Sequence, residues 1–161
     1  VSAKNASLLP EKVNDMFGLY YRENTDDGEI LKLSYTKDFK QWTEPEVISW
    51  PKGSAWQSFK WGTGSQALST EQGFLMVYHA VDDRQVYRLG LAMFDRKDPS
   101  RILWYSSAIL EPAMDYETHG YVPNVVYTCG ALIRNDELWI YYGAADRVIG
   151  RAVLSLSDIG L

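Results

Sequence analysis

The stretch LWIYYGAAD (residues 138–146) is the clearest indication of the fold, because its form recurs along the chain. Five apolar and aromatic residues are followed by small residues and a carboxylate. FLMVYHAVDD (74–83) and, more loosely, MFGLYYREN (16–24) have the same form. Aligning their YY, YH and YY pairs gives spacings of 58 and 63 residues. These similar spacings indicate an internal repeat.

A second segment follows each copy and keeps the same period. These segments are ILKLSYTKD, RLGLAMFD and IGRAVLSLSD, and aligning Ser34, Ala92 and Ala152 gives spacings of 58 and 60 residues. All are short, rich in Tyr, Val, Ile, Leu and Trp, and bounded by turn compositions such as DRKDPS, which is typical of strands. No long segment shows helical periodicity.

A repeat of about sixty residues, built from short antiparallel strands, is typical of one blade of a β-propeller. We therefore predict an all-β fold, a partial propeller with two to three blades of four-stranded antiparallel sheet. A single domain would span residues 1–161, with blade repeats at about 10–67, 68–130 and 131–161. Because propellers close with about four to eight blades, we expect upstream blades, or another chain, to complete the ring. The alternative is a β-sandwich whose strands are similar by coincidence.

Composition limits the partners. The net charge is −5 and the Lys and Arg residues are scattered among acids, which argues against nucleic acid. No window has eighteen consecutive apolar residues and the start VSAKNASLLP has no signal-peptide pattern, so we expect no membrane partner and a cytoplasmic location. The single Cys129 excludes an intramolecular disulfide and is interpreted as a small buried hydrophobe.

Aromatic residues make up 14% of the chain, and many lie beside Gly, Asp or His. Carbohydrate sites have this composition, since a sugar ring has an apolar face and a hydroxyl rim. The alternative is that aromatic residues simply favour strands.

Six segments together resemble the landmarks of glycoside hydrolase family 130, the β-mannoside phosphorylases and related mannosidases. In order, they are KNASLLPEKVNDMFGLYYR, FKWGTG, GFLMVYHAV, YRLGLAMFDRKDP, YETHGYVPNVVYTCG and YYGAADRVIGRA. The resemblance implies a five-bladed propeller whose full chain is about twice as long, with this chain forming the middle and C-terminal blades. It also implies that the general acid, an aspartate, lies upstream of Lys4, so no residue here is assigned a catalytic role.

Inverting phosphorolysis needs an acid on the glycosidic oxygen and a phosphate held against the anomeric carbon, hence several fixed cationic donors. By the resemblance, Arg22 and Lys60 bind phosphate, His79 and Tyr87 complete the site, and Lys4 stands where some members have an arginine. Phosphate would be a co-substrate, with no cofactor and no metal. The alternatives are solvated surface cations and, for His79, a structural hydrogen-bond donor.

The resemblance also implies three sugar-binding residues. Asp146 matches an aspartate that contacts hydroxyls of the sugar beside the scissile bond, and its alternative is a turn cap. Asn124 and Glu117 either line the pocket or pin loops between blades. The sequence departs from the usual family pattern at two places that affect the expected position of Lys60. SQAL (65–68) stands where the family usually has a proline-rich turn, and Ala80 stands where it usually has a glycine.

The sequence thus predicts part of an enzyme for inverting phosphorolysis of β-mannosides to α-mannose 1-phosphate, inactive as an isolated chain. The expected partners are a β-mannoside or manno-oligosaccharide, phosphate and, through exposed blades, further copies of the chain. A β-mannoside hydrolase and a non-catalytic sugar-binding or scaffold fragment are the alternatives. The retained basic positions favour phosphorolysis.

Overall fold

The computed structural model describes residues 2–26, 28–50 and 54–161, and within them the strands form three antiparallel sheets. The first sheet has the order β1 (Ser2–Leu8), β2 (Phe17–Thr25), β3 (Gly28–Thr36), β4 (Glu46–Ile48). The second has the order β5 (Lys60–Thr63), β7 (Phe74–Val81), β8 (Tyr87–Phe94), β9 (Ile102–Tyr105), and β6 (Leu68–Ser69) also pairs with β7. The third has the order β10 (Val126–Arg134), β11 (Glu137–Ala144), β12 (Val148–Ser155). The helices are short: η1 (Ala55–Gln57), α1 (Asp115–Thr118) and η2 (Leu156–Ile159).

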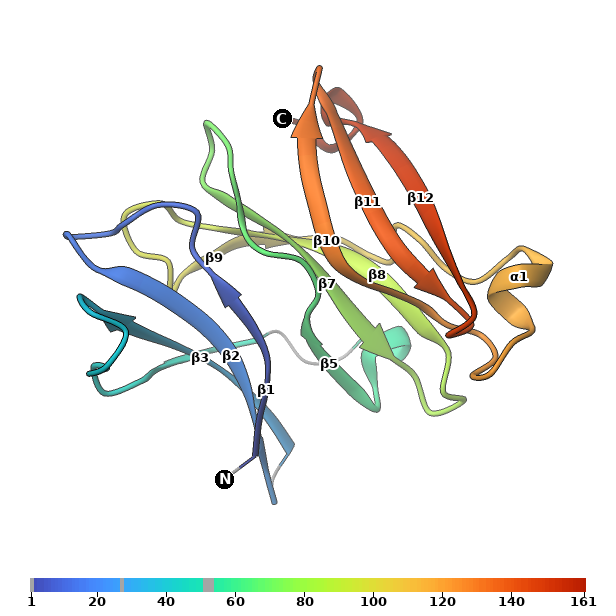
Figure 1. Ribbon diagram of the computed structural model, residues 1–161, viewed down its shortest axis with the longest axis horizontal. Helices are drawn as coiled ribbons and strands as arrows, with labels where there is room; N and C mark the ends of the chain where they lie inside the picture. The colour runs from blue at the N-terminus through green and yellow to red at the C-terminus, as the bar shows by residue number, and fades with distance from the viewer. Residues whose placement is uncertain (1, 27, 51–53) are drawn as a thin grey trace.

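Each sheet is a meander in chain order, and the second sheet lies between the other two (Figure 1). This arrangement confirms the predicted all-β fold of successive propeller blades. The sequence repeat has a direct structural counterpart. Its tyrosines fall on the second strand of each meander, β2, β7 and β11, and its second segments on the third strands, β3, β8 and β12.

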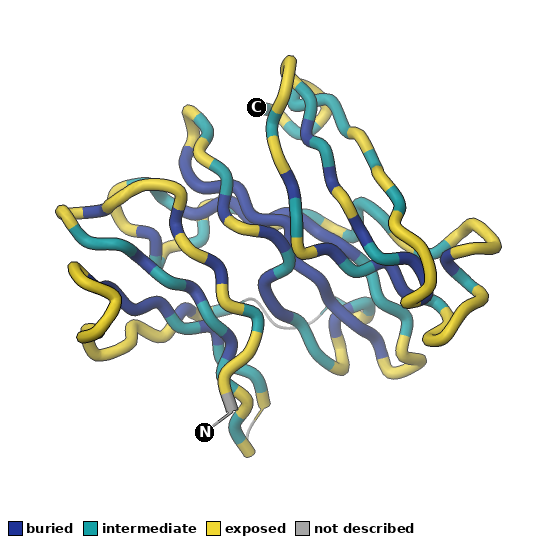
Figure 2. Tube along the Cα trace, viewed as in Figure 1, coloured by how far each residue is buried: buried dark blue, intermediate teal, exposed yellow. Residues whose placement is uncertain are grey.

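Strand β7, inside the middle sheet, is covered on both faces, which explains its continuous apolar run. Every residue of β7 is buried, whereas β2 and β11 alternate between more and less buried positions. Tyr78 packs in a core with Tyr20 and Leu33 of the first sheet, and Val77 packs in a second core with Leu138 of the third. Figure 2 shows this burial concentrated along the central strands.

The prediction that Cys129 is buried is wrong, because its side chain is exposed. Thr128 pairs with Tyr142 and Gly130 with Tyr141, so Cys129 is the extra residue of a β-bulge in β10. A bulge interrupts the inward and outward alternation of a strand, which turns this residue away from the core.

Among the described residues, no helix is both long enough and apolar enough to cross a bilayer.

Candidate functional site

Three of the residues predicted to bind phosphate lie at one end of the middle sheet. Lys60 begins β5 and Tyr87 begins β8, and both pair with Val81 at the end of β7. The Lys60 Nζ lies 4.9 Å from the centroid of the Tyr87 ring. The His79 ring is stacked with the Tyr87 ring, with the centroids 6.4 Å apart and the planes at 18°. The register of three strands therefore brings together residues that are far apart in sequence.

Arg22 reaches the same place from the first sheet. Its side chain is 6% exposed, NH1 donates to the Trp61 carbonyl at 2.7 Å, and NH1 lies 3.1 Å from Glu29 Oε1. Glu29 Oε2 in turn accepts a hydrogen bond from the Trp61 backbone N–H at 2.8 Å. Because Trp61 directly follows Lys60, this link between the sheets holds the guanidinium beside the Lys60 strand position.

His79 is neutral in this setting. Burial and the positive charges of Arg22 and Lys60 together lower the pKa of His79 to about 3, although a hydrogen bond to the Thr63 backbone acts to raise it. In the described part of the chain, two buried side-chain polar atoms have no hydrogen-bond partner, Nδ1 of His79 and Nε of Arg22. Buried polar atoms normally have partners, so two such atoms in one cluster point to a ligand.

Two residues without a role predicted from the sequence also join this cluster, Asn5 of β1 and Tyr127 of β10. Asn5 Nδ2 donates to the Tyr127 hydroxyl at 2.8 Å across 122 positions of sequence, and the Tyr127 ring centroid is 4.7 Å from that of His79. A Cβ on Gly62 would lie 2.9 Å from both Asn5 Oδ1 and His79 Cε1. The closeness of Asn5 of β1 to Gly62 of β5, and its hydrogen bond to Tyr127 of β10, bring all three sheets together at this point. Both residues lie inside the segments that carry the family resemblance, which was the available signal.

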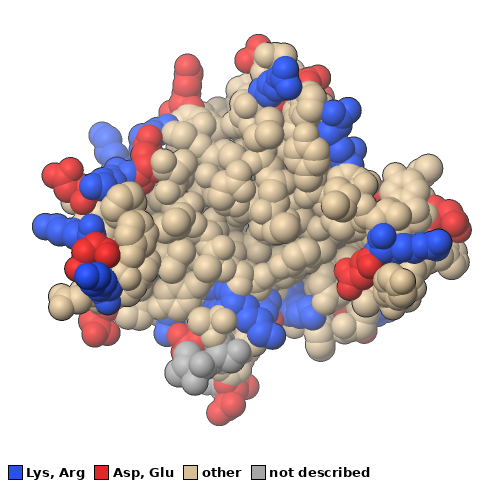
Figure 3. Space-filling model, in the orientation of Figure 1, with Lys and Arg blue, Asp and Glu red and all other residues tan. Residues whose placement is uncertain are grey.

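Lys4 lies at the edge of this cluster. It pairs with Arg22 in the β1–β2 ladder, and its side chain is exposed. Figure 3 shows Lys and Arg side chains gathered over β5 on a face that is otherwise mostly uncharged. Such a patch attracts anions despite the acidic net charge of the chain.

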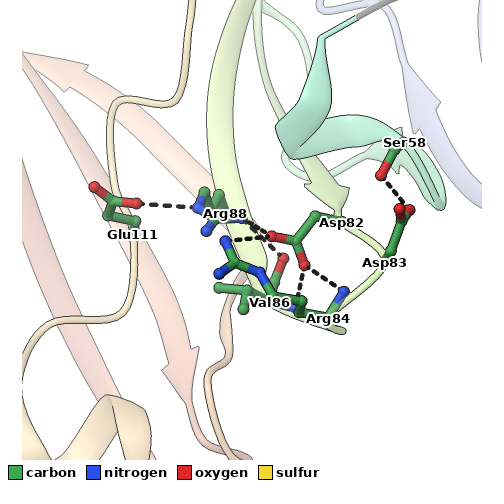
Figure 4. Close-up of polar contacts among 7 residues, drawn as sticks. All are labelled: Ser58, Asp82, Asp83, Arg84, Val86, Arg88 and Glu111. Atoms are coloured by element: carbon green, nitrogen blue, oxygen red, sulfur yellow. Dashed lines mark hydrogen bonds and ion pairs between the residues drawn. The ribbon is translucent and has the colours of Figure 1, made fainter.

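A polar network holds the β7–β8 turn, which directly precedes Tyr87 (Figure 4). Asp82 Oδ1 accepts from the backbone N–H groups of Arg84 at 2.9 Å and Val86 at 3.1 Å, and Asp82 Oδ2 accepts from Arg88 at 3.0 Å. Burial of Asp82 opposes its ionisation, but these donors outweigh it and hold the pKa of Asp82 below its usual value.

The same network reaches two neighbouring segments. The Arg88 Nε donates to Glu111 Oε2 at 3.0 Å, and Ser58 donates to Asp83 just before Lys60. The network therefore positions the segments that carry Lys60 and Tyr87.

Asp146 lies in the tight turn between β11 and β12. Ala145 and Asp146 have φ values of 47° and 52°, and the Arg147 N–H donates to the Ala144 carbonyl at 3.0 Å, as in a type I′ turn. The Asp146 side chain is exposed and makes no hydrogen bond within the described residues. The backbone hydrogen bond alone closes the turn, so the Asp146 carboxylate is available to a ligand.

Asn124 and Glu117 connect the loop before β10 to the two neighbouring sheets. The Asn124 carbonyl accepts the Tyr87 N–H at 3.0 Å. Glu117 is 3% exposed, and its carboxylate accepts from the Ala113 and Met114 N–H groups, both at 2.9 Å, and from the Tyr142 hydroxyl at 2.6 Å. Burial acts to raise the pKa of Glu117, but these bonds outweigh it and hold the pKa low. Both carboxylate oxygens are occupied, which favours the loop-pinning alternative for Glu117.

Within the described residues, no group of His, Cys, Asp and Glu side chains is arranged to hold a metal ion.

Comparison with known proteins supplies independent evidence. A family model described as "beta-1,4-mannooligosaccharide phosphorylase" matches residues 1–159. The chain is 39% identical over 157 residues to the 1,2-beta-oligomannan phosphorylase of Thermoanaerobacter sp. (strain X514), and 43% identical over 157 residues to the beta-1,2-mannobiose phosphorylase of that strain. These matches cover 97% of this chain, and 52% and 51% of the relatives.

A solved structure agrees with these sequence matches. The beta-1,2-mannobiose phosphorylase of Listeria innocua, in complex with beta-1,2-mannobiose, superposes with a TM-score of 0.91 at 28% identity. The match covers 98% of this chain and 46% of that one. The chain thus spans about half the length of the relatives it matches.

Proposed function

Because the chain belongs to glycoside hydrolase family 130, we propose that it carries the phosphate- and mannoside-binding residues of an inverting β-mannoside phosphorylase. The reaction takes a β-mannoside and inorganic phosphate to α-mannose 1-phosphate. The chain's relatives, a 1,2-beta-oligomannan phosphorylase and a beta-1,2-mannobiose phosphorylase, support the mannoside class and phosphorolysis.

The cluster around Arg22 is the observation that carries this proposal. This cluster contains the Arg22 guanidinium, which is 6% exposed, and a second cation at Lys60. It also contains the two buried polar atoms that have no hydrogen-bond partner among the described residues. Glu29 balances only one positive charge there, so an anion would complete the balance. The planar fork of Arg22 fits phosphate oxygens, and the Lys60 ammonium adds a mobile point charge.

In the proposed reaction, a phosphate oxygen attacks the anomeric carbon from the face opposite the glycosidic bond. That bond breaks, and the departing sugar oxygen takes a proton from the general acid. Arg22, Lys60, Tyr87 and His79 hold the phosphate, and Asp146 accepts hydrogen bonds from hydroxyls of the mannose. We assign the general acid to a part of the enzyme outside these 161 residues.

Two measurements test this function. Inorganic phosphate titrated into the protein should bind at one site, and Arg22→Lys should weaken binding roughly tenfold because the fork is lost. Arg101→Lys, whose side chain is 65% exposed, is the matched control and should bind as the wild type does. In an assay of the whole enzyme, including the part that carries the general acid, turnover of β-mannobiose should require phosphate and release α-mannose 1-phosphate. Equal rates without phosphate would instead identify a β-mannoside hydrolase.

A further inference from the structure

Four residues with exposed apolar side chains lie in the two segments that meet at the turn carrying Asp146. Tyr121 and Ile149 are each 84% exposed, Val122 is 42% exposed and Val148 is 41% exposed. Single exposed apolar residues are ordinary, but several of them close in the chain to one exposed carboxylate form a candidate binding surface. A sugar ring needs this combination, an apolar face for its C–H groups and a carboxylate for its hydroxyls.

Tyr121 belongs to a segment that is anchored at one end to the third sheet. The buried Glu117 holds the start of α1 through the Ala113 and Met114 N–H groups and accepts the Tyr142 hydroxyl of β11 at 2.6 Å. The exposed ring of Tyr121 therefore lies only four positions from a firmly held residue.

The other end of this segment is fixed to the Asp146 turn itself. The Val122 N–H donates to the Ala145 carbonyl at 3.3 Å, and the Ala145 N–H donates to the Val125 carbonyl at 2.9 Å. A Cβ on Gly120 would lie 2.3 Å from the Ala145 oxygen, so only glycine allows this approach. Figure 1 shows the segment after α1 running beside the β11–β12 turn. Tyr121 and Asp146 are thus each one residue away from the hydrogen-bonded pair that joins the two segments.

The same segment also contacts the cluster around Arg22. Asn124 follows three residues after Tyr121, and its carbonyl accepts the Tyr87 N–H at 3.0 Å. Tyr87 in turn lies beside Lys60. These contacts therefore connect the segment of Tyr121 and the turn of Asp146 to the cluster, and the Tyr121 ring is largely exposed.

We propose that Tyr121 is the aromatic platform on which a second sugar ring of the mannoside stacks, next to the ring whose hydroxyls Asp146 binds. This assignment rests on the proposed function of Asp146 and names the part of the substrate that Tyr121 recognises. A disaccharide should therefore bind more tightly than mannose, and the difference should depend on the ring of Tyr121.

The test compares the binding of β-mannobiose, mannose and inorganic phosphate by calorimetric titration. Tyr121→Ala should weaken mannobiose binding roughly five- to tenfold, the range expected for one stacked ring, and leave mannose and phosphate binding unchanged. Tyr121→Trp should retain mannobiose affinity. Tyr105→Ala on β9, where the ring is 41% exposed, is the matched control and should behave as the wild type does.

The outcomes separate this inference from the proposed function. Equal mannobiose affinity of Tyr121→Ala and the wild type overturns the platform and leaves the proposed function intact. Loss of phosphate binding in Tyr121→Ala also overturns it, because the effect would then be a general structural one. A wild-type protein that binds neither phosphate nor mannobiose refutes the proposed function, and the platform with it.

Discussion

His79 lies in β7 with 3% of its surface exposed, and its ring is neutral because burial lowers its pKa to about 3. In the unfolded chain a histidine pKa is about 6.5. Between these two values the unfolded state binds a proton that the native state does not. The contribution of His79 to the free energy of unfolding is therefore fully present above about pH 6.5 and decreases as the pH falls toward about 3.

We predict that this one group lowers the free energy of unfolding by about 1.5 kcal/mol between pH 6.5 and pH 5. Urea denaturation at a series of pH values measures this slope. His79→Gln should make the slope shallower, because glutamine binds no proton. His119→Gln is the matched control, since the side chain of this other histidine is 76% exposed. A slope that is the same in His79→Gln and in the control would contradict the prediction.

The family resemblance predicted Arg22, Lys60, His79 and Tyr87 as a group. The register of the middle sheet explains why the last three meet, and the contacts of Arg22 with Trp61 and Glu29 bring it to them from the first sheet. Cys129 was predicted wrongly because a bulge is a departure from alternation, which no alternating pattern reveals. The partnership of Asn5 with Tyr127 depends on the packing of separate sheets, which local sequence does not encode.

Among the elements, α1 depends on a single side chain. It has four residues, too few to be stable by its own propensity, and Glu117 fixes its start to β11. Glu117→Ala would leave the Ala113 and Met114 N–H groups and the Tyr142 hydroxyl without an acceptor. We expect the free energy of unfolding to fall by about 2–3 kcal/mol, the cost of unsatisfied buried polar groups.

Chemical denaturation and amide exchange at Ala113 and Met114 measure this effect. Asp115→Asn, in the same helix but with a side chain that is 94% exposed, is the control and should change stability by less than about 0.5 kcal/mol. A Glu117→Ala protein as stable as this control would show that Glu117 does not anchor the element.

The elements differ in how far the sequence predicts them. The paired strands β2–β3, β7–β8 and β11–β12 are the repeating segments themselves, because each must bury one or both faces. The connection that contains α1 has no such period. Its course depends on contacts such as Gly120 against Ala145, which lies in the turn between β11 and β12. A hydrophobic pattern cannot predict contacts between a loop and a distant turn.

At the scale of the whole molecule, the third sheet has one face in the core and one exposed. Its exposed side chains include Leu132, Tyr141, Ile149 and Val153, which are 38% to 84% exposed. Leu132, Trp139 and Val153 form one cross-strand row, and Arg151 stacks on the Trp139 ring at 4.4 Å. Strand β12 ends the sheet in the described part of the chain and so presents an edge. Exposed apolar faces and free strand edges both favour association.

We therefore predict that the protein self-associates through this face. Analytical ultracentrifugation should give a mass above 18.4 kDa that rises with concentration in the micromolar range. Combining Tyr141→Lys with Val153→Lys should shift the protein toward the monomer, because two buried positive charges oppose contact between apolar faces. His119→Lys, on the exposed loop after α1, adds charge elsewhere and should leave association unchanged.

A wild-type mass of 18.4 kDa at every concentration would exclude association. An equal mass for the double variant and the wild type, with both associated, would place the contact on another face.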